Sequence, residues 1–192
     1  MKRKCYQREV IKMSCVMDVA EILDLLYKHG WDERNGGNLS YLLEEEEVRD
    51  IVKEEVALKT FHYNFDLTPL IGKYLIITGT GKYFKNCLKD PSNNLGIMKV
   101  TDAHTLSLLW GYDDGGRPTS EAPTHLKCHI ERLKVDSKHR IVIHCHPTNV
   151  ICMTHVHDLD SAHWTKDLWK MQTESIVVFP EGIAVLPWIL CG

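Results

Sequence analysis

Apolar residues recur at helical spacing near the start of the chain. Between about residues 8 and 29 they fall three or four positions apart, which predicts an amphipathic helix. Lys28 and His29 suit the last turn of such a helix, and Gly30 suits the left-handed position that often follows it. The segment 31–40 is then rich in turn-forming residues and ends where a short strand can begin.

Shorter apolar runs, bounded by turn residues, alternate with amphipathic segments over the rest of the chain. Strands are predicted at 74–78, 95–100, 106–111, 140–145, 175–179 and 182–187. Helices are predicted at 120–133, 148–156 and 161–171. The acidic stretch 42–59 is expected to be an exposed, partly helical excursion, because a run of like charges is normally solvated. This order of elements indicates one α/β domain over 1–192, in which helices pack on a mixed sheet.

Composition narrows the class of protein. The 192 residues fit one domain with a full core, and 44% hydrophobic with 26% charged residues is ordinary for a soluble globular protein. A net charge of −3 argues against a nucleic-acid partner, which usually requires a basic surface. No signal-peptide core is present, and no apolar run reaches the roughly 18 residues of a membrane span. Seven irregularly spaced cysteines without a CxxC pair indicate reduced thiols, so we expect a cytoplasmic location.

The segment IVIHCHPTN carries the first candidate chemistry. Side chains two apart on a strand point to the same face, so His144 and His146 can hold one metal ion while Cys145 points away. Imidazole pairs suit Zn²⁺, and a catalytic zinc needs three protein ligands and an open position. A pair of half-buried structural histidines is the alternative. The similar pair His155 and His157 lies at the end of a predicted helix, so we interpret it as surface.

The predicted helix at 120–133 precedes this strand in the chain. Its inner stripe consists of Leu126, Ile130 and Leu133. Ser120 is the expected N-cap, and Pro123 is tolerated in the first turn. The Glu121 carboxylate can simply interact favourably with the positive end of the helix dipole. Alternatively, it can exchange a proton with a metal-bound substrate if the helix begins beside the metal.

Three short segments are suited to bind an anion. RNGGN at 34–38 and TGTG at 78–81 contain glycines that let backbone N–H groups approach a phosphate, with Asn and Thr as neutral donors. Neither is a Walker or a Rossmann loop, and each alone can be an ordinary turn. Thr119 and Ser120 add a third element at a helix N-terminus. Together with one candidate metal site, the three segments favour phosphate binding.

Taken in order, these segments resemble one family. The chain resembles the class II aldolase/epimerase family in five segments: GWDERNGGNLS, TGTGKYF, PTSEAPTH, HCHPTN and VVFPEG with VLPW. The resemblance runs from about residue 16 onward, apart from a divergent stretch near 44–62. The resemblance implies a mainly antiparallel sheet flanked by helices, a zinc cofactor, a homotetramer and a lyase reaction on a phosphorylated ketose. WDERNGGN and FPEG favour the branch that cleaves L-rhamnulose 1-phosphate to dihydroxyacetone phosphate and L-lactaldehyde. Fuculose- or pentulose-phosphate enzymes, or a non-catalytic assembly domain like the adducin heads, are alternatives.

The resemblance also implies roles for single residues. His144 and His146 would be zinc ligands, and Glu121 would handle the proton at the carbon that loses its neighbour. Glu174 would assist from a neighbouring subunit. The substrate phosphate would lie against Asn35, Gly37, Asn38, Thr80, Thr119 and Ser120.

One feature of the family is missing from the sequence. The third zinc histidine of the family follows the VLPW segment, whereas this sequence stops at PWILCG. We therefore expect a domain truncated at its C-terminus, with weaker zinc affinity because its coordination shell is incomplete. His125 lies one helical turn after Glu121 on the same face and is the best internal substitute, ahead of His155 and His157.

Overall fold

The computed structural model describes residues 10, 13–49 and 56–188, which fall into two compact units. The first unit reaches His146, and the second begins at Pro147. A single domain over 1–192 stays a prediction. None of the described helices combines the length and the apolar character that a membrane crossing needs.

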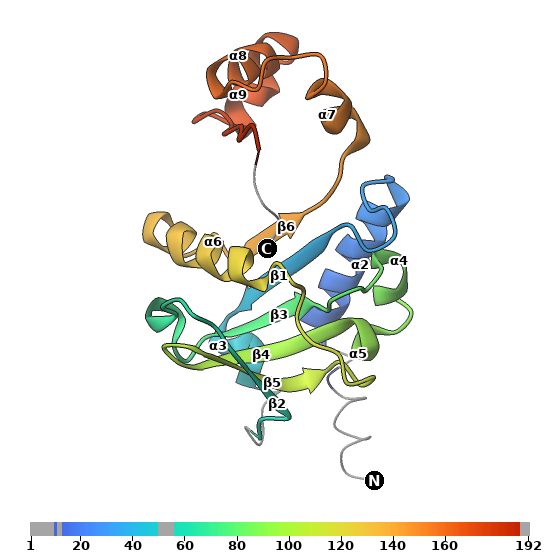
Figure 1. Ribbon diagram of the computed structural model, residues 1–192, viewed down its shortest axis with the longest axis vertical. Helices are drawn as coiled ribbons and strands as arrows, with labels where there is room; N and C mark the ends of the chain where they lie inside the picture. Colours follow the sequence, from blue (N-terminus) through green and yellow to red (C-terminus); the bar gives the residue numbers. More distant parts are fainter. Residues whose placement is uncertain (1–9, 11–12, 50–55, 189–192) are drawn as a thin grey trace. The chain divides into compact units, whose positions relative to one another are not determined.

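A six-stranded sheet forms the centre of the first unit, in the order β2-β5-β4-β3-β1-β6 (Figure 1). Its strands are β1 (Asn38–Leu43), β2 (Lys59–His62), β3 (Tyr74–Thr78), β4 (Leu95–Asp102), β5 (Thr105–Gly111) and β6 (Ile141–His144). Every neighbouring pair is antiparallel. The expected α/β class with a mainly antiparallel sheet is confirmed.

Two long helices cover the two faces of this sheet. The amphipathic α2 (Ser14–Lys28) packs on one face in a cluster that buries Trp110. The other face packs against α6 (Ala122–Val135), whose Leu126 is fully buried beside partly buried Ile130 and Leu133. The apolar stripe predicted for this helix is therefore confirmed. Short helical turns complete the unit: α3 (Glu45–Arg49), η1 (Thr68–Leu70), α4 (Phe84–Cys87) and α5 (Pro91–Asn94).

The start of α6 differs from the prediction. The N-cap position belongs to Glu121 rather than Ser120, and no side chain caps the helix there. The reason lies in Thr119, whose backbone N–H bonds to the Thr78 carbonyl oxygen at 2.9 Å and whose hydroxyl accepts from the Glu121 N–H at 3.3 Å. These bonds keep the chain against the end of β3 until Glu121, so the helix begins one residue later than expected.

The acidic excursion at 42–59 is partly helical and mostly exposed, as predicted, although residues 50–55 lie outside the described part of the chain. Its two ends were predicted wrongly, because β1 extends to Leu43 and β2 begins at Lys59. The β2 strand is an edge strand whose side chains are mostly exposed. Without a buried face it carries no alternation of apolar and polar residues, so its sequence gives no strand signal.

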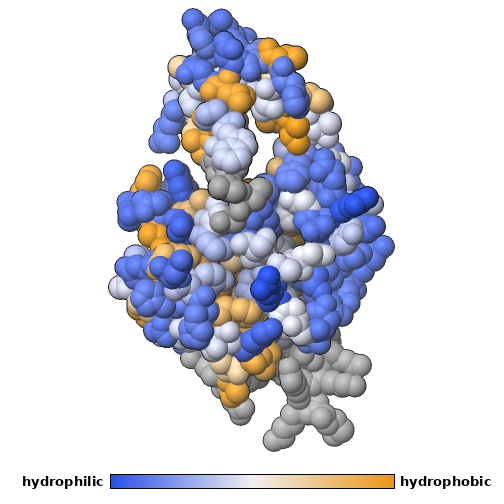
Figure 2. All heavy atoms as spheres, in the orientation of Figure 1, coloured by the Kyte–Doolittle hydropathy of each residue, from blue (hydrophilic) through white to orange (hydrophobic). Residues whose placement is uncertain are grey.

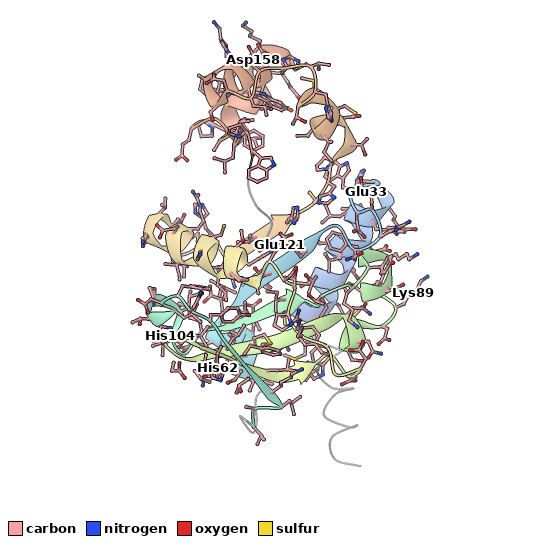
Figure 3. The ribbon with its side chains drawn as sticks, viewed as in Figure 1. Glu33, His62, Lys89, His104, Glu121 and Asp158 are labelled. Carbon is pink, nitrogen blue, oxygen red and sulfur yellow. The ribbon has the colours of Figure 1, made fainter. Side chains whose placement is uncertain are left out.

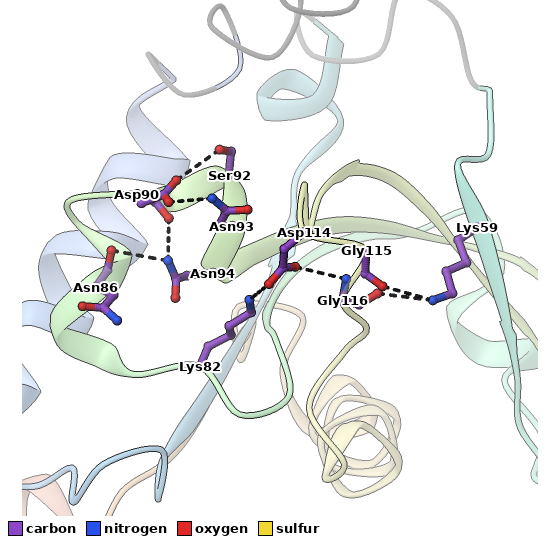
Figure 4. Close-up of polar contacts among 10 residues, drawn as sticks. All are labelled: Lys59, Lys82, Asn86, Asp90, Ser92, Asn93, Asn94, Asp114, Gly115 and Gly116. Carbon is purple, nitrogen blue, oxygen red and sulfur yellow. Dashed lines mark hydrogen bonds and ion pairs between the residues drawn. The ribbon is translucent and has the colours of Figure 1, made fainter.

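Polar side chains hold the connection between β3 and β4 (Figure 4). The Asp90 carboxylate accepts from Asn93 Nδ2 at 2.6 Å and from Ser92 Oγ at 3.3 Å. Lys82 forms an ion pair with Asp114 in the loop that follows β5. The ion pair ties the residue directly after the TGTG segment to the loop that follows β5.

The second unit contains α7 (Thr148–Met153), α8 (Ser161–Met171) and α9 (Glu174–Val178). The first two confirm the predicted helices, but the strands predicted at 175–179 and 182–187 are wrong: α9 occupies the first segment and the second is irregular. A strand needs a neighbouring strand for its backbone hydrogen bonds, and the described part of this unit contains none. A helix satisfies them internally. Many apolar side chains of this unit are exposed, Val177 to 79% (Figure 2).

Candidate active site

The two histidines of the HxH motif converge at the edge of the sheet. His144 ends β6 and lies opposite Asn38 of β1. His146 follows the strand, and its backbone N–H donates to the Trp31 carbonyl oxygen at 2.8 Å. The two imidazole Nε2 atoms lie 3.1 Å apart. Both side chains are about one-third exposed, His144 to 37% and His146 to 31%, so an ion can reach them from solvent.

The other ring nitrogen of each histidine contacts a carboxylate. Nδ1 of His144 lies 2.8 Å from Glu121 Oε2, and Nδ1 of His146 lies 3.0 Å from Glu33 Oε2. Figure 3 shows Glu121 at the start of α6 and Glu33 in the loop after α2. The sequence singled out Glu121 but not Glu33, which has no motif of its own beyond its place in WDERNGGN. A carboxylate on Nδ1 fixes the hydrogen there and leaves a lone pair on Nε2.

This donor set fits a divalent cation such as zinc. Two nitrogen ligands of one tetrahedral zinc lie about 3.3 Å apart, given Zn–N bonds of about 2.0–2.1 Å. The observed separation of 3.1 Å between the two Nε2 atoms is close to this value. Across residues 10, 13–49 and 56–188, no group of three or more His, Cys, Asp or Glu side chains is arranged to hold a metal. The described chain thus supplies two ligands.

His125 is not a third ligand in this structure. Its Nδ1 lies 2.7 Å from Ser40 Oγ, and its Nε2 bonds to Asn38 Oδ1, so both ring nitrogens are engaged. Burial, with smaller effects of nearby His129 and His144, lowers the pKa of His125 to about 4. The ring is therefore neutral at neutral pH and packed inside the unit.

The three segments predicted to bind phosphate meet at Thr78. The hydroxyl of this buried residue accepts from the backbone N–H of Leu39, directly after the RNGGN segment, at 3.1 Å. Its carbonyl oxygen accepts from the Thr119 N–H at 2.9 Å. Thr78 itself opens TGTG. Nothing in the sequence singles out Thr78, because its partners lie 39 and 41 positions away and only the sheet brings them together.

The glycines of RNGGN allow the loop to lie against the histidines. A Cβ atom on Gly36 would lie 2.8 Å from His146 Cε1, and one on Gly37 would lie 2.9 Å from the His144 carbonyl oxygen. The loop is held by Asp32, whose carboxylate accepts from the N–H groups of Gly37 and Phe84 at 3.4 and 3.2 Å. Burial raises the pKa of Asp32, and these N–H groups partly offset the effect.

The remaining residues predicted for the site differ in their exposure and in their contacts. Asn35, Thr80 and Ser120 are exposed, and the backbone N–H of Thr80 already donates to Arg117 at 2.9 Å. A cavity of about 440 Å³ lies beside Ser120 and Thr119 and is also lined by Arg117, a cation that the sequence did not single out. Glu174 lies at the exposed start of α9 in the second unit and stays a prediction for the active site.

Comparison with known proteins identifies the family. Residues 17–191 match the Class II Aldolase and Adducin N-terminal domain. The chain belongs to this class II aldolase family. It is 45% identical over 186 residues to a rhamnulose-1-phosphate aldolase of Listeria innocua, which covers 96% of this chain and 68% of that protein. A rhamnulose-1-phosphate aldolase of Enterococcus faecalis is 46% identical over 184 residues, or 95% of this chain and 66% of that protein.

A solved structure agrees with these relatives. The sugar-phosphate aldolase of Thermotoga maritima superposes with a TM-score of 0.72 at 25% identity, over 91% of this chain and 68% of that chain. The resemblance inferred from the motifs is confirmed. The chain is an enzyme of the class II aldolase type, a lyase, and enzymes of this class depend on a metal ion.

Proposed function

We propose that this class II aldolase catalyses the zinc-dependent retro-aldol cleavage of L-rhamnulose 1-phosphate to dihydroxyacetone phosphate and L-lactaldehyde, in cytoplasmic rhamnose catabolism. The observation that carries the proposal is the convergence of His144 and His146 on one point, with Glu121 at hydrogen-bonding distance from the first ring. Relatives that carry the name rhamnulose-1-phosphate aldolase, at 45% and 46% identity, support this substrate. A bound zinc ion would supply a Lewis acid for the ketose oxygens.

Glu121 is proposed to move the proton. Cleavage breaks the bond between C3 and C4 of the ketose, the electron pair stays on C3, and the C4 hydroxyl loses its proton as the aldehyde forms. C3 must then gain a proton. The Glu121 carboxylate lies 2.8 Å from His144 and is half-buried beside the ligand pair, so it is placed to accept the C4 hydroxyl proton and, once protonated, to deliver it to C3. Glu174 is proposed to assist from a neighbouring subunit of a homotetramer.

The phosphate of the substrate is proposed to bind where the three segments meet. Asn35, Gly37, Asn38, Thr80, Thr119 and Ser120 would supply neutral donors. Their convergence on Thr78 supports this assignment. Arg117 would add a positive charge from the wall of the neighbouring cavity.

The test is cleavage by the zinc-loaded chain, followed by coupled reduction of the released dihydroxyacetone phosphate. L-Rhamnulose 1-phosphate and L-fuculose 1-phosphate, which both release dihydroxyacetone phosphate, are assayed in parallel. L-Ribulose 5-phosphate is followed separately by its conversion to D-xylulose 5-phosphate. Glu121→Gln should lower kcat by about 10²–10⁴-fold, the usual contribution of a positioned acid or base. Glu131→Gln is the matched control, because Glu131 lies on the same helix with its side chain 67% exposed.

Three results would contradict the proposal. A folded, metal-loaded chain that cleaves none of the substrates would contradict the reaction. Preference for one of the other two sugar phosphates would contradict the substrate and leave the class of enzyme intact. Full activity in Glu121→Gln would contradict the role of that carboxylate.

A further inference from the structure

A row of buried polar side chains lies behind Asn38. His129 Nε2 lies 2.7 Å from Ser40 Oγ, which lies 2.7 Å from His125 Nδ1. The other nitrogen of His125, Nε2, bonds to Asn38 Oδ1. Ser40, His125 and His129 are at most 1% exposed. We call these three residues the buried row. Their side chains have no part in the metal or proton chemistry above.

The hydrogen bonds of the buried row are all donated in one direction, towards Asn38. Asn38 presents Oδ1, which only accepts, so His125 Nε2 carries the hydrogen. Because the ring is neutral, its Nδ1 must accept, and the Ser40 hydroxyl donates to it. Ser40 Oγ then accepts from His129 Nε2, another imidazole whose pKa burial lowers to about 4.

The far end of the row is consistent with this direction. His129 Nδ1 is buried and has no hydrogen-bond partner among the described residues. If donation ran the other way, this atom would be a buried N–H without an acceptor. An unpaired buried N–H is rarer in proteins than an acceptor with a spare lone pair, so the hydrogen belongs on Nε2.

On its other side, Asn38 faces the candidate active site. Its Nδ2 lies 3.3 Å from His144 Nδ1, which carries the hydrogen that the Glu121 carboxylate accepts at 2.8 Å. A nitrogen that donates cannot also accept, so the Asn38 amide keeps N–H groups for an anion. The two ends of a carboxamide are nearly the same size. Without the buried row, the amide would turn its oxygen towards the His144 N–H.

We propose that Ser40, His125 and His129 are positioning residues that hold the Asn38 carboxamide with its N–H groups towards the substrate phosphate. The inference rests on the proposed function, because it assumes a phosphate at that site. Breaking the buried row would let the amide present its oxygen to the anion. Losing one hydrogen bond to a charged group corresponds to an affinity about tenfold weaker or more.

The first experiment measures the affinity of the 192-residue chain for inorganic phosphate by isothermal titration. Ser40→Ala should bind phosphate about tenfold more weakly, whereas Ser40→Thr, which keeps the hydroxyl, should recover most of the affinity. Ser107→Ala is the matched control, because Ser107 is also a buried strand serine but pairs with Thr101 at 3.1 Å. Amide NMR spectra establish that each variant keeps the fold.

The second experiment reads the ring hydrogens directly. Nitrogen-15 NMR of labelled histidine at pH 7 should show His125 and His129 as neutral rings with the hydrogen on Nε2, and Ser40→Ala should disturb both signals. A hydrogen on Nδ1 of His125 would overturn the inference. So would equal phosphate affinity in the wild type and a folded Ser40→Ala. A wild-type chain that binds no phosphate would contradict the proposed phosphate site as well as the positioning role.

Discussion

Acidification from pH 7 to pH 5 should destabilise the first unit through two buried histidines. Burial lowers the pKa of His125 and of His129 from 6.5 to about 4. In the unfolded chain both rings regain the ordinary value. Below pH 6.5 the unfolded chain therefore binds protons that the native chain does not. The stabilising contribution of the two neutral rings to the free energy of unfolding is complete above pH 6.5 and is lost as the pH falls towards 4.

The expected loss of unfolding free energy follows from the difference between the native and the unfolded pKa of each histidine. At pH 5 each histidine lowers the free energy of unfolding by about 2 kcal/mol, and at pH values below the native pKa by about 3 kcal/mol. The pair therefore lowers it by about 4 kcal/mol at pH 5, a large part of the roughly 5–15 kcal/mol that stabilises a typical domain.

The assay is urea unfolding followed by circular dichroism at pH 7 and pH 5. Carboxylates also titrate in acid, so variants isolate the histidine contribution. His129→Gln keeps an amide that can bond to Ser40 but no titrating ring, and it should lose about 2 kcal/mol less than the wild type. His29→Gln, a change at an exposed histidine, should behave like the wild type. An equal loss of stability on acidification in His129→Gln and the wild type would show that the buried ring of His129 does not cause the acid sensitivity.

Two substitutions beside the histidine pair give further predictions. Glu33→Gln removes the carboxylate 3.0 Å from His146 Nδ1 and should weaken zinc binding by about tenfold or more, measured by competition with a chelating dye; unchanged affinity would show that Glu33 does not orient the ring. Gly37→Ala places a Cβ atom 2.5 Å from Phe84 Cζ and should cost about 1–3 kcal/mol of stability in thermal unfolding. Unchanged stability there would contradict the close packing of the loop.

The elements that could be predicted from sequence are those with a clear hydrophobic pattern. The α2 helix has a buried stripe at helical spacing, and β3 is a run of apolar residues buried on both faces. β2 lacks such a pattern because it is an exposed edge strand. The β-branched run at 175–179 looks like a strand in any window of sequence, and only the absence of a neighbouring strand in the described unit makes it a helix.

The residues of the candidate site also divide into those with a local sequence signal and those without one. His144 and His146 were found because their spacing in the sequence is itself the signal, although β6 ends at His144, and Glu121 because it opens a helix. His129 belongs to no local motif, and nothing in the sequence marks out Ser40 and Glu33 within the segment GWDERNGGNLS. Their partners lie far away in the sequence: His146 contacts Glu33 across 113 positions, and His129 of α6 contacts Ser40 of β1 across 89. Such contacts depend on the register of the sheet, which a single sequence does not give.

Metal binding by His144 and His146 is the most direct test of the proposed active site. Zinc content and affinity would be measured for the wild type, His144→Ala and His157→Ala, the last from the exposed second pair of the same spacing. The wild type and His157→Ala should bind about one zinc ion per chain, as one HxH site implies. His144→Ala should lose this binding. Equal zinc in the wild type and a folded His144→Ala would show that the HxH pair does not bind the metal.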